Sequence, residues 1–239
     1  MQHYFGTIVS GKAILEGNQA HHLLHVKRAN KGEKIEVTDS GTSYLCMIEE
    51  IEPLSILVLE QIQTRRELDI HLSLAFAALK GDHNDLIVLK GTELGVDTFI
   101  PFLSSRCIVK PASPEDNKIL RYRKIAVEGA KQCRREAIPN VTSYKKLEDV
   151  LSSDAEIKLF AYEEMSGGSD TIISACKNMK KGQTVLLVVG PEGGFSHEEA
   201  RLALDYDFTL VSLGKRILRA ETAAIFGASV IAALSEEEG

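Results

Sequence analysis

From residue 70 onward the sequence alternates between apolar strands and helices, and this alternation restricts the fold more than any other feature. The stretch IHLSLAFAAL at 70–79 is continuously apolar, as expected for a strand that is buried on both faces. Repeated β-α units indicate a mostly parallel sheet with helices on both of its faces. We therefore predict an α/β domain over residues 68–239, with further strands at 97–103, 157–162, 184–189 and 208–213.

The first 67 residues follow a different pattern, which predicts a separate domain. Residues 33–62 read as short strands separated by turn residues at Asp39-Ser40-Gly41 and Glu52-Pro53. Residues 18–29 are compatible with one short helix. We predict a small, barrel-like β domain over residues 1–67, which ends in a polar stretch suited to a linker.

Composition restricts the class of protein and its location. The 239 residues are 44% hydrophobic and 26% charged, as in ordinary globular proteins, and no apolar run approaches the roughly 18 residues of a membrane span. The sequence does not open with a basic stretch followed by an apolar one, so we expect no secretory signal and a cytoplasmic protein. The four cysteines are far apart, which favours reduced thiols over a zinc site or disulfides. His21, His22 and His25 have no acidic or cysteine companion in register, so we predict no metal.

Positive charge gathers in one segment of an otherwise acidic chain. Residues 104–146 contain eleven Lys/Arg and four Asp/Glu, a net charge of +7, whereas the whole chain has a net charge of −6. Such a segment is a candidate contact for a polyanion, although a run of charge also occurs on an ordinary solvated face. The charge alone leaves both interpretations open.

Capping residues mark two of the predicted helices. Asp82 is the expected N-cap and Gly95 the expected C-terminal stop of one helix. Ser113 and Pro114 predict the start of a longer helix that runs to about Ala137. On that helix three basic residues share one face, with Arg121 beside it: Lys124, Lys131 and Arg135.

Two strand exits carry glycine and are expected to form one pocket. They are VVGPEGGFSHEE at 188–199 and VSLGKRILRAETAA at 211–224. In an open parallel sheet, ligands bind at the carboxyl ends of the strands. Ser196 and Glu199 have the spacing of a capping box, which disfavours a phosphate at that helix N-terminus. Gly193 and Gly194 instead leave backbone groups open to a heterocycle edge or a ribose.

These segments resemble the RsmE family, bacterial methyltransferases of the SPOUT superfamily that modify N3 of a uridine in small-subunit ribosomal RNA. GPEGGFSHEE (190–199) and LGKRILRAETA (213–223) resemble the paired signature of the family. The resemblance covers both predicted domains, through HHLLHVKR (21–28), ALKGD (78–82), KGTELGV (90–96) and EGAKQCRREAIP (128–139). The last segment departs from the family at Gly129, where alanine is expected.

The resemblance implies a fold, a cofactor and partners. It implies a PUA-like barrel at the N-terminus and an α/β domain whose C-terminal part is threaded as a deep trefoil knot. Family members bind S-adenosylmethionine (SAM) in the knot and are homodimers, and their substrate is 16S ribosomal RNA in the small subunit, with no role for DNA or membranes. The residues expected to enclose SAM are Gly190, Glu192, Gly193, Gly194, Leu213, Gly214, Ile217 and Leu218.

The reaction itself suggests catalytic residues. Uracil N3 lies on the Watson–Crick edge, so the base must be unpaired before it can be methylated. N3 also carries a proton, and a cation beside O2 or O4 would stabilise the anionic base that forms when this proton leaves. Arg219 is the first candidate for that cation, and Arg135, from the same subunit or from the partner subunit, is the second. Glu221 is a candidate base, with capping or pairing to Arg219 as the alternative. The predicted RNA-binding residues are His22, Lys27, Arg28, Arg106, Arg121, Arg123, Lys124, Lys131, Gln132 and Arg135.

Other functions remain open at this point. A Rossmann-type nucleotide enzyme requires a glycine fingerprint after the first strand, and KGDHND at 80–85 lacks it. Another SPOUT activity, or a non-catalytic RNA-binding assembly factor, would keep the basic helix. The assembly factor would have no reason to keep both glycine segments. Binding of SAM without NAD favours a methyltransferase over the Rossmann-type enzyme, and binding of neither favours the assembly factor.

Overall fold

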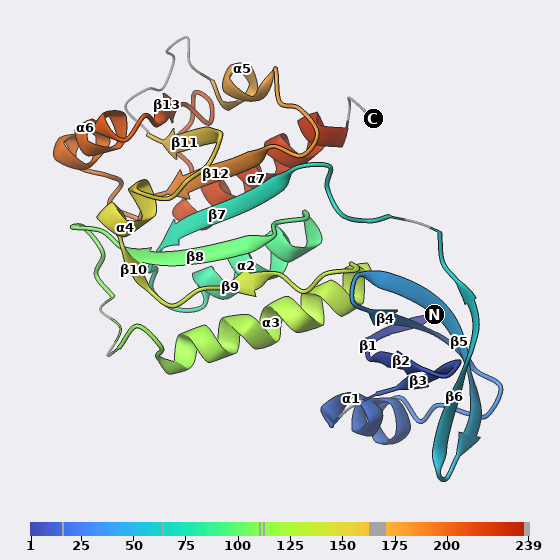
Figure 1. The fold of residues 1–239 in the computed structure, drawn as a ribbon. Helices are drawn as coiled ribbons and strands as arrows, with labels where there is room; N and C mark the ends of the chain where they lie inside the picture. The colour runs from blue at the N-terminus through green and yellow to red at the C-terminus, as the bar shows by residue number, and fades with distance from the viewer. Residues whose placement is uncertain (16, 64, 110, 112, 163–170, 237–239) are drawn as a thin grey trace. The chain divides into compact units, whose positions relative to one another are not determined.

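The computed structural model describes residues 1–15, 17–63, 65–109, 111, 113–162 and 171–236 (Figure 1). The chain forms two compact units. Unit 1 contains Met1–Glu67 together with Ala130–Ile138, and unit 2 contains Leu68–Gly129 together with Pro139–Gly239. Among the described residues no helix has the length and apolar character needed to cross a membrane.

Unit 1 is built on a six-stranded sheet that curls back on itself. Its strands, in spatial order, are β1 (Gln2–Phe5), β4 (Lys34–Asp39), β5 (Thr42–Ile51), β6 (Leu54–Gln61), β3 (Lys12–Ile14) and β2 (Thr7–Val9). The two end strands, β1 and β2, are joined by Gly6 alone, so the sheet has to curve round. No side chain fits at that joint, because a Cβ on Gly6 would lie 2.6 Å from the Ile14 carbonyl oxygen. Sequence reasoning missed the strands before residue 15.

The helix predicted at 18–29 is present, with a widened last turn. Helix α1 (Asn18–His21) continues directly into the π-helical turn η1 (His22–Val26), in which the Lys27 amide donates to the His22 carbonyl at 2.9 Å. Leu23 is fully buried in the core of unit 1. The predicted turn at Asp39-Ser40-Gly41 connects β4 to β5, with Ser40 and Gly41 both at positive φ.

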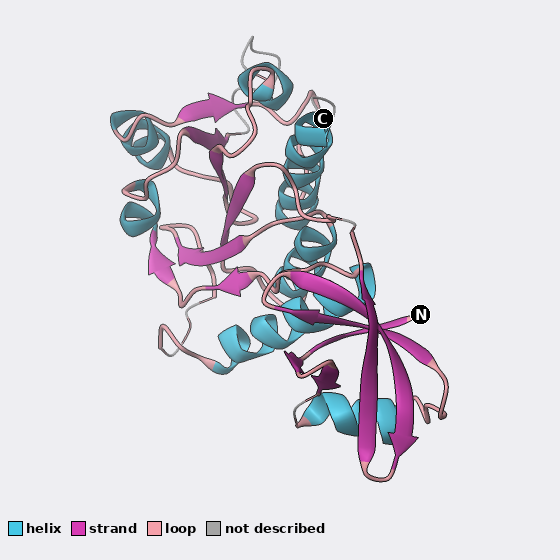
Figure 2. Ribbon diagram, turned by 45° about the vertical axis from the view of Figure 1, so that its right-hand side comes forward, coloured by secondary structure: helices cyan, strands magenta, loops and turns pink. Residues whose placement is uncertain are grey.

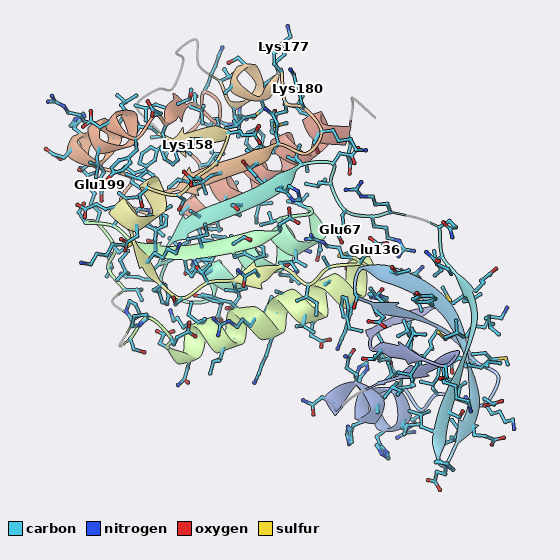
Figure 3. All side chains as sticks on the ribbon, in the orientation of Figure 1. Glu67, Glu136, Lys158, Lys177, Lys180 and Glu199 are labelled. Carbon is cyan, nitrogen blue, oxygen red and sulfur yellow. The ribbon has the colours of Figure 1, made fainter. Side chains whose placement is uncertain are left out.

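A charged network holds residues 130–138 in unit 1. The Arg66 guanidinium donates to Glu36 Oε1 at 2.5 Å and to the Arg134 carbonyl at 2.9 Å, while the Arg66 amide donates to Glu136 Oε2 at 3.0 Å. Glu36 has no exposed surface. Beside it, Arg135 donates to Glu67 Oε2 through Nε and Nη2 (Figure 3 labels Glu67 and Glu136).

Unit 2 contains the predicted parallel sheet. The strands are β7 (His71–Ala77), β8 (Thr98–Leu103), β9 (Asn140–Val141), β10 (Lys145–Lys146), β11 (Ile157–Ala161), β12 (Thr184–Val189) and β13 (Thr209–Val211). Their spatial order is β10-β8-β7-β12-β11-β13, with β9 also on β8, and all of these pairs are parallel. β7 lies in the middle of the sheet, as its continuous apolar sequence predicts.

Helices cover both faces of this sheet, which confirms the predicted three-layer arrangement (Figure 2). Leu72, Leu74 and Phe76 of β7 point to one face, where α2 (His83–Glu93), α3 (Asn117–Cys133), α5 (Ile172–Cys176) and α7 (Ala220–Glu236) supply the packing partners. Ala75 and Ala77 point to the other face, which α4 (Leu147–Leu151) and α6 (His197–Asp205) cover. The alternation of β7 side chains therefore divides the apolar core of unit 2 into two layers.

The end of α2 and the start of α6 follow the predictions, whereas both ends of α3 differ from them. Asp82 occupies the N-cap position of α2 as predicted, but its side chain makes no capping hydrogen bond. Gly95 at φ 91° follows the last turn of α2, as predicted. Helix α3 begins at Asn117 instead of after Ser113, because the Asp116 carboxylate accepts from the amides of Lys118 (2.8 Å) and Ile119 (3.4 Å). At the other end it stops at Cys133, since Arg134 adopts a left-handed φ of 61°. Arg135 therefore does not share the helical face of Lys124 and Lys131.

Candidate functional site

A cavity of about 470 Å³ opens at the carboxyl ends of the unit 2 strands. Its wall is formed by segments that follow β11, β12 and β13, together with the first residues of α2 and α7. This is the edge at which open parallel sheets bind ligands, and the volume lies within the range of small-molecule sites. Lining residues include Tyr162, Gly190, Glu192, Gly194, Ser212, Gly214, Leu218, Arg219 and Glu221.

The first wall is the loop after β12, residues 190–196, and its conformation is fixed by close packing. A turn is closed by the Gly194 amide, which donates to the Pro191 carbonyl at 2.9 Å, and Gly194 then adopts a φ of 64°. The ring of Phe195 is buried against Phe160 at 4.0 Å between ring centroids. Gly190 has to be glycine because a Cβ there would lie 2.9 Å from the Phe195 ring.

Helix α6 starts from this loop with the predicted capping box. Ser196 Oγ accepts from the Glu199 amide at 3.2 Å, and Glu199 Oε2 accepts from the Ser196 amide at 2.9 Å. The second carboxylate oxygen of Glu199 accepts from the Ser105 amide at 2.8 Å (Figure 3 labels Glu199). The capping box therefore satisfies the N–H groups of Ser196 and Glu199 within the protein. The loop residues that face the cavity are Gly190, Pro191, Glu192, Gly194 and Phe195.

The second wall is the segment 212–219 between β13 and α7. Gly214 adopts a φ of 117°, and the Ser212 hydroxyl accepts from its amide at 3.1 Å and donates to its carbonyl at 3.2 Å. Ile217 is 79% exposed although it lines the cavity, while Leu218 is half-buried. With Leu213, the segment thus presents one polar turn and three apolar side chains to the cavity.

Three ionisable side chains lie around the start of α7. Glu221, in the first turn, is 8% exposed, and its Oε1 lies 3.3 Å from Nδ1 of His83 at the start of α2. Arg219 is exposed immediately before the helix, where its carbonyl accepts from the Ala223 amide. All three residues line the cavity. A cation, a carboxylate and an imidazole are therefore available to a bound molecule.

The structure brings together seven of the eight residues expected to enclose a cofactor. Gly193 is the exception among the described residues: it is exposed and lies against the side chain of Arg106. Of the predicted catalytic residues, Arg219 and Glu221 line the cavity, but Arg135 does not. Arg135 belongs to unit 1, is 2% exposed and is bound to Glu67, so its guanidinium is part of a buried ion pair. The partner of the Glu221 carboxylate is the His83 ring, at 3.3 Å, and not Arg219.

The predicted RNA-binding residues divide by their partners. Arg121 is paired with Asp85, and Arg123 is paired with Glu115 at 2.9 Å and also donates to the Val141 carbonyl. Arg106 donates to two main-chain carbonyls of the loop after β12. His22 is half-buried, with Nδ1 3.3 Å from the Tyr4 hydroxyl. The remaining ones are Lys27, Arg28, Lys124 and Gln132, which are exposed, and Lys131, which is half-buried.

Among the cavity residues that sequence reasoning missed are two with ionisable side chains, His83 and Tyr162. Both follow the carboxyl end of a parallel strand, β7 and β11 respectively, which is the signal that could have found them. The Tyr162 hydroxyl lies 3.1 Å from His197 Nδ1.

Four cysteines are free, and burial raises the pKa of Cys46 and of Cys176 to about 11, so these two thiols are poor nucleophiles at neutral pH.

This fold and cavity define an α/β enzyme domain, and comparison with known proteins identifies its class as RNA methyltransferases. The family model described as RNA methyltransferase domain matches residues 66–232, and the one described as RNA methyltransferase PUA domain matches residues 15–61. Ribosomal RNA small subunit methyltransferase E of Bacillus subtilis (strain 168) is 34% identical over 93% of this chain and 90% of that protein. The Synechocystis protein of the same name is 30% identical over 96% of this chain and 75% of that protein.

A solved structure agrees with these relatives. The crystal structure of ribosomal RNA small subunit methyltransferase E from Neisseria gonorrhoeae bound to S-adenosyl methionine is 26% identical, with a TM-score of 0.84 and 98% of each chain covered. The chain belongs to the ribosomal RNA small subunit methyltransferase E (RsmE) family, which confirms the resemblance of the sequence motifs.

Proposed function

We propose that this protein transfers a methyl group from SAM to N3 of a uridine in 16S ribosomal RNA. The observation that carries the proposal is the joining of the two glycine segments in one cavity, with Arg219 and Glu221 on its wall, in a member of the RsmE family. Relatives with that name include one solved with S-adenosyl methionine bound.

The residues of the cavity fit SAM. Gly190 and Gly194 expose main-chain groups that can bind the polar edge of the adenine, and Leu213 and Leu218 supply apolar surface for its faces. Glu192 lines the same cavity and gives it a negative charge that suits a sulfonium. When bound there, SAM supplies an electrophilic methyl group.

The ionisable residues at the start of α7 act on the uracil. The target base has to leave its stack, since N3 is otherwise covered by pairing. The Glu221 carboxylate, held by His83, takes the proton from N3. The guanidinium of Arg219 then stabilises the negative charge that develops on O2 or O4. We do not assign Arg135 to this step, because its guanidinium is buried against Glu67.

Mapping the methyl group tests this proposal. Small ribosomal subunits from a strain that lacks the protein are incubated with labelled SAM and the protein, and the modified nucleotide is mapped by mass spectrometry. We expect one methyl at uracil N3. Arg219→Ala should lower kcat about 100-fold while SAM affinity stays unchanged, because the cation acts only in the transition state. A methyl on carbon or on a ribose oxygen, or label in transfer RNA, would contradict the proposal.

We further propose that the boundary at residue 67 separates an RNA-binding PUA-like barrel (1–67) from a methyltransferase domain (68–239) threaded as a trefoil knot, with residues 130–138 of the second part returning to the barrel unit. The match of residues 15–61 to the PUA family supports the first part. The path of the C-terminus supports the second: segment 212–219 leads from the edge strand β13 to α7, which contacts β12 and β7 in the middle of the sheet.

We propose that Lys124 is one of the phosphate contacts. It is exposed on α3, whereas its neighbours Arg121 and Arg123 are engaged by carboxylates. Lys124→Ala should weaken RNA binding and lower the slope of log affinity against log salt by about one unit. The matched control is Lys180→Ala, which removes an exposed lysine elsewhere in unit 2 and should leave that slope unchanged. An unchanged slope for Lys124→Ala would mean that this face is only solvated.

We also propose that the protein is a homodimer and works in the cytoplasm, where ribosomal subunits are assembled. Phe226 of α7 is 40% exposed and Ile217 of the preceding segment is 79% exposed, and a second copy of the chain would cover such apolar surface. Light scattering of the protein in solution tests the dimer, and Phe226→Glu should shift it toward the monomer.

A further inference from the structure

The side chain of Arg106 is bound to the glycine loop of the cavity without lining the cavity. Arg106 lies in the loop after β8 and is exposed. Its Nη1 donates to the Gly193 carbonyl at 2.9 Å and to the Phe195 carbonyl at 3.2 Å. The cavity wall within the described part of the chain does not include it. One guanidinium therefore bridges two peptide groups of the loop from outside the cavity wall.

The stem of Arg106 packs on the loop as well. A Cβ built on Gly193 would lie 3.6 Å from Arg106 Cβ and 3.8 Å from its Cδ, so the aliphatic part of the side chain rests against this glycine. The neighbouring Ser105 amide donates to Glu199 at the start of α6. Residues 105 and 106 thus contact both ends of the segment 193–199.

These contacts fix the peptide planes that shape the loop. The Gly193 carbonyl shares its peptide plane with the Gly194 amide, which closes the turn on Pro191. The Phe195 carbonyl shares its peptide plane with the Ser196 amide, which donates a hydrogen bond to the Glu199 carboxylate. Two successive glycines have the largest conformational freedom of any dipeptide, and a loop that is ordered only when a ligand binds loses affinity. A donor that holds both planes in advance removes much of that loss.

We propose that Arg106 is a positioning residue that holds the loop 190–196 in its SAM-binding conformation. This inference rests on the proposed function of the same cavity. It replaces the sequence-based prediction that Arg106 contacts RNA phosphate, since the guanidinium is engaged by carbonyl oxygens. The Glu198 carboxylate lies in the same surroundings, and its pKa is lowered by a hydrogen bond from Ser196 and, to a smaller extent, by Arg106.

Calorimetry with SAM and binding to small-subunit RNA together test the proposal on the full-length protein. We expect Arg106→Ala to weaken SAM binding about tenfold, with kcat at saturating SAM, RNA affinity and its salt slope all unchanged. Amide hydrogen exchange at residues 193–196 should become faster while the thermal midpoint stays near that of the wild type. Arg201→Ala, which removes an exposed arginine of α6 outside the cavity wall, is the charge-matched control and should change none of these quantities.

The conservative variant separates positioning from phosphate contact. Arg106→Lys keeps the positive charge but has a shorter stem and no planar fork, so SAM binding should stay weakened while RNA affinity equals that of the wild type. Unchanged SAM affinity in both variants, or a lower salt slope for RNA in Arg106→Ala, would overturn the inference. If the wild-type protein itself fails to bind SAM, the proposed function fails, and this outcome is distinguishable because it needs no variant.

Discussion

At the scale of single residues, the adjacent glycines Gly193 and Gly194 lack a side chain for different reasons. Gly194 has a φ of 64°, a conformation that costs an L-residue roughly 1–2 kcal/mol. Gly193 has no such conformation, and the nearest atom to a Cβ there would be at an ordinary van der Waals distance of 3.6 Å. One glycine is required by the backbone and the other is only packed against Arg106.

The two alanine variants should therefore behave differently. Gly194→Ala should weaken SAM binding about tenfold or more, because the turn that faces the cavity has to open to relieve the strain. Gly193→Ala is the matched control, with the same change one residue away, and should bind SAM nearly as well as the wild type. Calorimetry measures both. Equal losses in the two variants would mean that the main chain at residue 193 also contacts the methyl donor.

The sequence predicts the main chain of the cavity better than its charged side chains. Gly190, Gly194 and Gly214 follow parallel strands, and strand direction alone brings their backbone to one edge. Arginines are different, because a long side chain can bind an RNA phosphate, a carboxylate or a carbonyl. Local charge predicts RNA contacts for both Arg106 and Arg135. Their partners, Gly193 and Glu67, are 87 and 68 residues away in the sequence, so no local pattern reveals them.

At the scale of elements, the cap at the start of α6 links two loops beside the cavity. Glu199 is 9% exposed, and its two carboxylate oxygens accept from the amides of Ser196 and Ser105. It thereby joins the loop after β12 to the loop after β8. Glu198 is the neighbouring acid of the same first turn, but its side chain is exposed.

Glu199→Gln should lower the free energy of unfolding by about 1–3 kcal/mol. An amide has only one oxygen, so its NH2 group would face one of the two backbone N–H donors and leave it unsatisfied. Urea denaturation measures this loss. Glu198→Gln is the control, and it should change stability by less than about 0.5 kcal/mol. A Glu199→Gln protein as stable as the control would show that the second oxygen contributes nothing.

Helix α3 shows where local signals fail. Ser113-Pro114 is a good helix start by itself, but Asp116 captures two amides three residues later and becomes the cap. At the other end the sequence has no glycine or asparagine to signal a stop. Arg134 takes the left-handed conformation, and the chain beyond it gains the contacts of Arg135 and Ala137 with Glu67. These contacts come from a distant segment, which sequence periodicity does not reveal.

At the scale of the whole molecule, each of the two units is made from two separate parts of the chain. A division at residue 67 follows from the change of pattern in the sequence, but the return of 130–138 to unit 1 does not. That return depends on the buried carboxylate of Glu36, which Arg66 neutralises, together with Glu136 and the Arg134 carbonyl on the returning segment. The sequence shows these residues only as ordinary charges, because burial arises from the assembled unit.

A buried histidine beside this network makes the stability of unit 1 depend on pH. His3 is 6% exposed, and its Nε2 lies 2.8 Å from the Thr38 hydroxyl. Burial lowers the pKa of His3 to about 4; Glu36 raises it, whereas Arg66 and Arg134 lower it further. The unfolded chain binds the proton near the ordinary pKa of about 6.5, while the folded chain does not bind it until about pH 4. Between these values the unfolded state holds more protons, so stability falls as the pH falls.

We therefore expect the free energy of unfolding to be highest above pH 6.5 with respect to His3. It should fall progressively as the pH is lowered to 4, by up to about 3 kcal/mol. His3→Gln cannot titrate but retains a donor for Thr38, so its thermal midpoint should decline less than that of the wild type between pH 7 and pH 4.5. The carboxylates whose pKa values are lowered, such as Asp39 and Glu49, are common to both proteins, so they cancel in the comparison. If the thermal midpoints of the two proteins instead decline in parallel with pH, the His3 ring has an ordinary pKa in the folded state.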